Sequence, residues 1–154
     1  MEKVIFNQLA RTRSRTLQLL DAVTEDVADV IPSGFNNSVR WQLGHILTVQ
    51  ERYASKLIGL PMDLPESYTK LFENGTKPAD WDVTPPSLQV LKEELSKQTG
   101  RTQQKLDGKL ETRLDEPIRG METLGDIMAN MIHHEGVHIG SISALQKAIA
   151  VIKA

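Results

Sequence analysis

The sequence predicts an all-α protein, a four-helix bundle. Three observations support this fold class. Four long segments repeat apolar residues at helical spacing, no segment convincingly alternates as a strand, and two longer connections join the segments. With 154 residues, of which 40% are hydrophobic and 25% charged, the chain is most simply one domain covering residues 1–154.

The first helix is predicted over residues 3–31, and Pro32-Ser33-Gly34 is expected to end it. One face of this segment is apolar, with Ile5, Leu9, Leu20, Val23, Val27 and Val30. Arg11, Arg13 and Arg15 alternate along the same segment, so they fan around the helix. We expect them to lie in solvent rather than to form a basic patch.

The second helix is predicted from Asn37-Ser38, both good N-cap residues, to about Gly59. From Leu60 to Pro86 the periodicity fails, because six prolines and glycines interrupt it. A connection of this length is usually functional or carries a short helix. Its apolar residues indicate that it lies against the body of the protein; they are Tyr68, Leu71, Phe72 and Trp81.

The third helix is expected to start after Thr84-Pro85-Pro86, with a proline in its first turn, and to end near Asp107. A turn containing Pro117 and Gly120 follows. The last helix is predicted to open at Thr123, whose hydroxyl can cap it, with Asp126 near its positive end, and to run almost to the C-terminus.

Composition excludes several classes of protein. The net charge is −2 with scattered lysine and arginine, so no electrostatic footprint for nucleic acid is present. The absence of cysteine excludes disulfides, thiolate metal ligands and a cysteine nucleophile, and fits a reducing cytoplasm. No stretch approaches the roughly 20 apolar residues that a membrane-spanning helix needs, and the segment MEKVIFNQLARTRSR lacks the apolar run expected of a signal peptide.

Three of the four histidines lie between Met131 and Ile139 in the last helix. His134 and His138 are four residues apart on its core stripe, so both imidazoles lie on one face, the spacing of a two-point metal chelate. Such a pair also arises by chance and needs a third ligand. His45, in the second helix beside Gly44, can supply it across the bundle, and three histidines with one open position are typical of a catalytic metal site. His133 points about a third of a turn away.

Two acidic residues accompany these histidines. Glu135 and Glu51 are expected to be surface charges, or alternatively to hydrogen bond to a ligand histidine. They are also the only general bases that the sequence suggests.

The segments "NNSVRWQLGHILTVQERY" and "HHEGVHIGSISAL", in this order and spacing, resemble the DinB-like superfamily, which includes YfiT-like proteins. This resemblance covers most of the chain. It implies an up-up-down-down bundle with a long connection between the second and third helices, often a homodimer. It also implies a divalent metal, zinc or nickel, on His45, His134 and His138. Some relatives are S-transferases that use a low-molecular-weight thiol such as bacillithiol, and others are thiol-dependent isomerases.

Three functional hypotheses follow. In the first, the metal's open position accepts a low-molecular-weight thiol, which attacks a small electrophilic substrate. In the second, metal-bound water hydrolyses an ester or amide, with Glu135 or Glu51 as the base. In the third, the metal is a structural clasp or sensor in a non-catalytic helical dimer.

Overall fold

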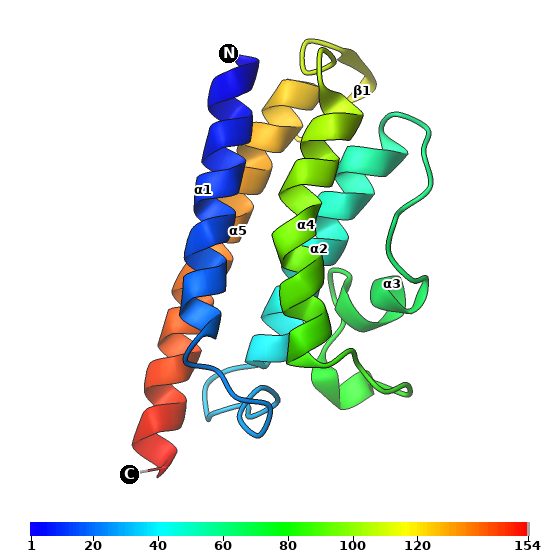
Figure 1. Cartoon of the computed structure of the whole chain (residues 1–154). Coiled ribbons are helices and arrows are strands. Elements are labelled where there is room, and N and C mark those ends of the chain that lie inside the picture. Colours follow the sequence, from blue (N-terminus) through cyan, green and yellow to red (C-terminus); the bar gives the residue numbers. More distant parts are fainter. Residues whose placement is uncertain (154) are drawn as a thin grey trace.

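Four long helices build the body of the protein, in a computed structural model that describes residues 1–153. They are α1 (Glu2–Leu20), α2 (Val39–Lys56), α4 (Leu88–Leu106) and α5 (Leu124–Lys153), and they lie side by side along most of their length (Figure 1). The predicted four-helix bundle is therefore confirmed. Within residues 1–153, no helix combines the length and the hydropathy that crossing a membrane requires.

The directions of the helices differ from the expected up-up-down-down order. Arg13 of α1 pairs with Glu135 of α5, and Leu19 lies beside Gln146, so α1 and α5 run parallel. Helices α2 and α4 also run parallel to each other and opposite to the first pair, as Figure 1 shows. The order is up-down-down-up, because the connection from α2 returns along the bundle before α4 begins.

Helix α1 ends at Leu20, eleven residues earlier than the periodicity predicted. Residues 21–30 continue as successive turns, in which Val23 and Ala28 remain buried. Arg40 at the start of α2 holds this segment, because its guanidinium pairs with Glu25 and Asp29. The apolar pattern therefore predicted correctly that this segment packs against the core. It did not predict the turns, which the ion pairs of Arg40 favour over a continued helix.

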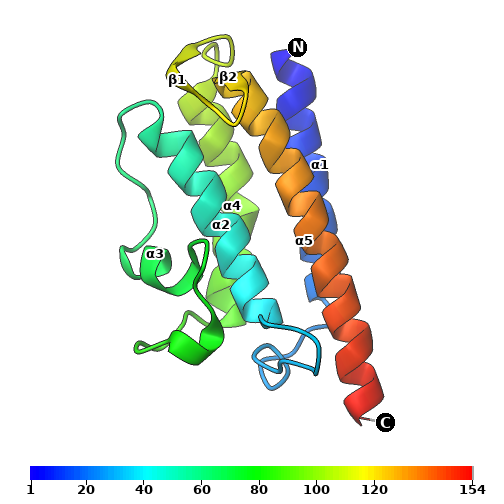
Figure 2. The ribbon, with the colours of Figure 1, turned by 180° about the vertical axis from the view of Figure 1, so that it is seen from behind.

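The connection between α2 and α4 carries two short helices, α3 (Ser67–Phe72) and η1 (Pro78–Asp80). Seen from behind in Figure 2, it descends along α2 and folds back against that helix. Helix α4 then begins after Ser87, whose hydroxyl accepts from the amide of Val90, so the two prolines precede the helix rather than occupying its first turn.

A β-hairpin, not a simple turn, joins α4 to α5. Strands β1 (Arg113–Ile118) and β2 (Met121–Thr123) pair antiparallel, with Arg119 and Gly120 at the tip, both at positive φ. Two left-handed residues are the geometry of a tight hairpin turn. The strands are short and mostly exposed, so their sequence lacks the alternation that would have predicted them. Thr123 caps α5, as expected.

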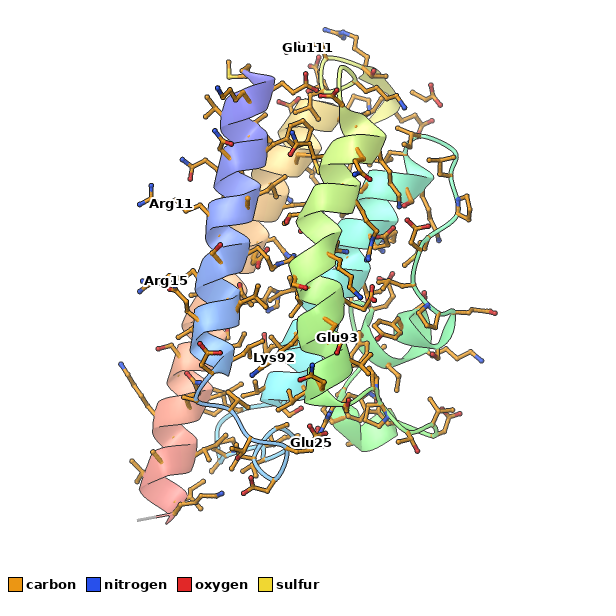
Figure 3. All side chains as sticks on the ribbon, in the orientation of Figure 1. Arg11, Arg15, Glu25, Lys92, Glu93 and Glu111 are labelled. Atoms are coloured by element: carbon orange, nitrogen blue, oxygen red, sulfur yellow. The ribbon has the colours of Figure 1, made fainter. Side chains whose placement is uncertain are left out.

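The core consists of two apolar clusters with a polar layer between them. One cluster includes Leu20, Leu47, Leu95 and Ile142, and the other includes Leu9, Val49, Leu106 and Met131. On α1, α4 and α5 the polar layer lies between these residues, and on α2 it directly follows them. Its buried members are Arg13, Thr16, Gln50, Glu51, Gln98, Thr102 and Glu135. Arg13 was expected in solvent with Arg11 and Arg15; only the latter two point outward, as Figure 3 shows.

Candidate metal centre

The imidazoles of His45, His134 and His138 meet between α2 and α5. Nε2 of His134 lies 3.3 Å from Nε2 of His45 and 3.1 Å from Nε2 of His138. One ligand atom from each ring lies within 4.8 Å of the other two. The three residues that the helical period selected are therefore brought together, because α2 and α5 are antiparallel and in contact at this level.

Two of the three rings are held through Nδ1, the nitrogen that points away from the meeting point. Nδ1 of His45 lies 2.6 Å from the carbonyl oxygen of Phe72, and Nδ1 of His138 is hydrogen bonded to the side-chain oxygen of Gln42. A carbonyl oxygen only accepts, so each Nδ1 carries the proton and each Nε2 keeps a lone pair. This is the usual way in which proteins orient histidine ligands.

The distances fit a tetrahedral ion. Nitrogens bound to zinc at about 2.0–2.1 Å in a tetrahedron lie about 3.3 Å from each other, close to the two Nε2 distances in the triad. Hydrogen bonds alone satisfy the arrangement poorly, since a single proton on Nε2 of His134 can serve only one of two neighbouring lone pairs at a time. A metal cation can accept the lone pairs of all three Nε2 atoms at the same time.

Burial keeps the triad neutral. Burial lowers the pKa of all three imidazoles. The pKa of His134 falls to about 4 and that of His138 to about 3, and the pKa of His45 is also below its usual value. The neighbouring histidines lower the pKa values of His134 and His138 further, because two adjacent imidazolium charges repel. Neutral imidazole is the form that binds metal, so the folded chain presents ligands that need little deprotonation near pH 7.

The connection between α2 and α4 forms one wall of the site. The ring of Phe72 covers Gly44 so closely that a Cβ at this position would lie 2.4 Å from it. Trp41 stacks on His45 with 4.5 Å between ring centroids, and its indole nitrogen donates to Thr76. Gly44 is thus required by the close approach of Phe72, which in turn supplies the carbonyl that orients His45.

Glu135 lies next to His134 in the sequence but its side chain turns toward α1. Its carboxylate accepts from Nε of Arg13 at 2.8 Å and from the hydroxyl of Thr16 at 2.6 Å. Both partners are buried, so the expectation of a surface charge was wrong. The hydrogen bonds of Arg13 continue to Gln50 and Gln98, which ties all four long helices together around one ion pair.

Glu51 is also buried, on the side of α2 that faces α4. It pairs with Lys105 at 2.6 Å and accepts from Ser55 and from the amide of Asp63. Burial raises the pKa of this carboxyl, but the hydrogen bonds, foremost that of Lys105, outweigh it and lower the pKa. Neither Glu51 nor Glu135 makes a hydrogen bond to a triad histidine within residues 1–153, and both are neutralised by a buried or half-buried cation.

His133 is exposed and lies outside the triad. A separate groove of about 540 Å³ runs between residues 22–27 and the last turns of α5, and its lining includes none of the triad histidines. We take the triad rather than this groove as the candidate site, because its three imidazoles lie close enough to share one metal ion. The sequence did not reveal Gln42 and Phe72, which support the triad from another helix and from a backbone carbonyl.

Comparison with known proteins identifies the family and the fold of the chain. The sequence profile of the DinB superfamily matches residues 8–142. The chain belongs to the DinB superfamily. Among solved structures, this DinB-superfamily chain is similar to the crystal structure of a conserved protein from Enterococcus faecalis, with a TM-score of 0.71 and 18% identity over 97% of each chain, which shows a shared fold. None of the curated proteins matches the chain.

Proposed function

We propose that His45, His134 and His138 bind one divalent metal ion, zinc or nickel, and that the loaded protein is a transferase acting with a low-molecular-weight thiol on a small electrophilic substrate. The convergence of three Nε2 lone pairs, two of them fixed by Nδ1–H bonds, is the observation that supports it. Imidazole ligands suit either ion. When bound, the ion supplies a Lewis-acidic position at which a thiol is held as its thiolate at neutral pH.

The chain's own residues would position the ligands and limit the access of water. Gln42 and the carbonyl of Phe72 hold two rings in the tautomer that leaves Nε2 free, while Trp41 covers one face of His45. In a transfer reaction the thiol loses its proton, its sulfur bonds to the electrophilic carbon, and the leaving group departs with the electron pair of the broken bond. No cysteine competes for the metal or the electrophile.

The hydrolytic alternative has less support from the geometry. A general base within hydrogen-bond reach of the metal-bound water would assist it. The two carboxylates suggested for this role are held by Arg13 and Lys105 instead. A thiol bound to the metal is deprotonated outright, whereas bound water loses its proton only near pH 7 or above, so the transferase depends less on a base.

Metal analysis of the purified protein tests the site. We expect about one ion per chain in the wild type, and almost none in the triple alanine variant of His45, His134 and His138. The variant His133→Ala, which changes an exposed histidine in the same helix, should retain the metal. Equal metal content in all three proteins would overturn the site.

Mass spectrometry tests the reaction. Loaded protein is mixed with cellular thiols and a panel of electrophiles, and thiol adducts that depend on the triad are expected. Adducts that form equally with the triple variant would refute the transferase, and thiol-independent ester hydrolysis that chelation abolishes would support the hydrolase.

We also propose a homodimer formed through the exposed face of α5. This face consists mostly of small and apolar residues, with His133 and Lys147 among them; the small and apolar ones are Gly136, Val137, Gly140, Ala144, Val151 and Ile152. Val137 is 55% exposed although it is in the middle of a long helix, which is the kind of surface that subunit contacts cover. Light scattering should show a dimer in the wild type and a monomer for Val137→Glu, and a monomeric wild type would contradict this.

A further inference from the structure

Arg52 lies beside the triad and has no part in holding it. Seven residues separate it from His45, nearly two helical turns, so both side chains leave α2 on the same side. Nη1 of Arg52 donates to Glu73 at 2.9 Å, and Glu73 directly follows Phe72, whose carbonyl oxygen is bonded to His45. These two neighbouring bonds hold the guanidinium next to the site.

The guanidinium of Arg52 has donors to spare. It carries five N–H groups that stay protonated at any physiological pH. Within residues 1–153 its only hydrogen bond is the one from Nη1, and its Nε is buried without a partner. Nearly all buried donors in folded proteins are paired, so the edge formed by Nε and Nη2 is suited to an acceptor from outside the chain.

Arg101 on α4 shows why position matters. It too has an Nη bond to a glutamate at 2.9 Å and an unpartnered buried Nε, and its side chain is 25% exposed against 27% for Arg52. No triad histidine is on its helix. An unpartnered nitrogen alone therefore does not mark a site, and the nearness of Arg52 to the triad is what distinguishes it.

The charge of Arg52 reaches two of the three imidazoles. Burial is the main reason for the low pKa values of His45 and His134, and the positive charge of Arg52 lowers both slightly further. Burial and the neighbouring histidines account for the lowered pKa of His138 without Arg52. Along α2 the guanidinium belongs to a residue about two turns beyond His45 and about three turns beyond Trp41.

We propose that Arg52 is the anion-binding residue of this site and that the small-molecule ligand carries a carboxylate, which accepts from Nε and Nη2 while its other end reaches the triad. The inference rests on the proposed metal site. A planar guanidinium edge matches the two oxygens of a carboxylate, and this pairing is stronger than a single neutral hydrogen bond. Glu73 holds the third nitrogen, which fixes the direction of the free edge.

Calorimetry with a matched pair of thiols tests the proposal. The zinc-loaded protein is titrated with 3-mercaptopropionate and with 3-mercapto-1-propanol, which differ in the carboxylate. We expect the acid to bind about tenfold more tightly or better in the wild type. This preference should disappear in Arg52→Met, fall in Arg52→Lys, and persist in the control Arg101→Met. If the two thiols bind the wild type equally well, or if the preference is unchanged in Arg52→Met, the proposal is overturned.

A second measurement does not depend on thiol binding. In ¹⁵N NMR of the metal-free and the zinc-loaded protein, succinate should shift the Nε–H signal of Arg52 and leave that of Arg101 in place. If succinate moves the Arg52 signal but neither thiol binds, the thiol-dependent function fails and the anion site stands. If the thiols bind and the Arg52 signal does not move, the anion site fails and the thiol function stands.

Discussion

The side-chain oxygen of Gln42 on α2 accepts a hydrogen bond from Nδ1 of His138 on α5. The amide is buried and is the only group that orients this ring from its outer nitrogen within residues 1–153. If the amide turned over, its NH₂ would face Nδ1 and the proton would move to Nε2, the nitrogen that would bind the proposed metal. The orientation of one glutamine therefore decides whether His138 can be a ligand.

Replacing Gln42 with leucine should weaken metal binding about 10- to 100-fold, because the ring loses its orienting partner. Gln42→Glu should preserve binding, since a carboxylate can only accept. Competition with a chromophoric chelator measures both affinities. The exposed Gln89→Leu serves as the control, and an affinity for Gln42→Leu equal to that of the control would show that the ring is held by packing alone.

Gly44→Ala should destabilise the protein and loosen α3. The new Cβ would lie 2.4 Å from the ring of Phe72, so the ring and its segment must move, at a cost of about 1–3 kcal/mol. Chemical denaturation and hydrogen exchange over residues 67–76 provide the readouts. Gly100→Ala has open space around it in α4 and should stabilise by up to about 1 kcal/mol. Similar stability changes for both variants would contradict the close contact.

The Arg13–Glu135 ion pair should behave as a unit. Arg13→Met or Glu135→Leu alone leaves a buried charge unpaired and should cost about 3–5 kcal/mol, whereas the double variant should recover much of that loss. Urea unfolding of the four proteins gives the coupling energy. Arg15→Met, on the exposed side of α1, should change stability by about 0.5 kcal/mol or less. Additive losses in the double variant would argue against direct pairing.

Metal-free protein should lose stability as the pH falls from about 6.5 toward 4. The pKa values of His134 and His138 are lowered to about 4 and about 3, below the 6.5 of an unfolded chain. In that window the unfolded state binds more protons, so acid favours unfolding, and stability returns as the pH rises. Melting temperatures across this range measure the slope. A variant with His134→Gln and His138→Gln should have a flatter profile, and an identical slope would mean that other groups are responsible.

Part of the site could be predicted from the sequence because it follows from the helical period. His134 and His138 share a face by their spacing, and His45 could be matched to them once two helices were expected to meet. Gln42 and the carbonyl of Phe72 escaped prediction, because polar residues within helices are ordinarily exposed and any backbone carbonyl can accept. Arg13 was misjudged for the same reason, since its partner is 122 residues away.

The fold shows the same division. The four helices could be predicted from the periodicity of their apolar residues. Ser38 and Thr123 correctly predicted the beginnings of α2 and α5. The end of α1 depends on the ion pairs that Arg40 forms with Glu25 and Asp29. These partners are too far from Arg40 in the sequence for a local pattern to predict the pairs. The direction of α2 depends on the path of a connection whose residues carry no periodicity, so the up-down-down-up order became clear only in three dimensions.

The carbonyl oxygen of Phe72 limits how the three histidines could be transferred to another protein by design. Three histidines placed at the same register on another four-helix bundle would reproduce the donors, but His45 would be free to carry its proton on either nitrogen. The segment that fixes the tautomer of His45 belongs to a connection between helices, and designers usually shorten connections first. A design should therefore include residues 67–76 as well as the helices, and it should keep a glycine at position 44, where the ring of Phe72 packs.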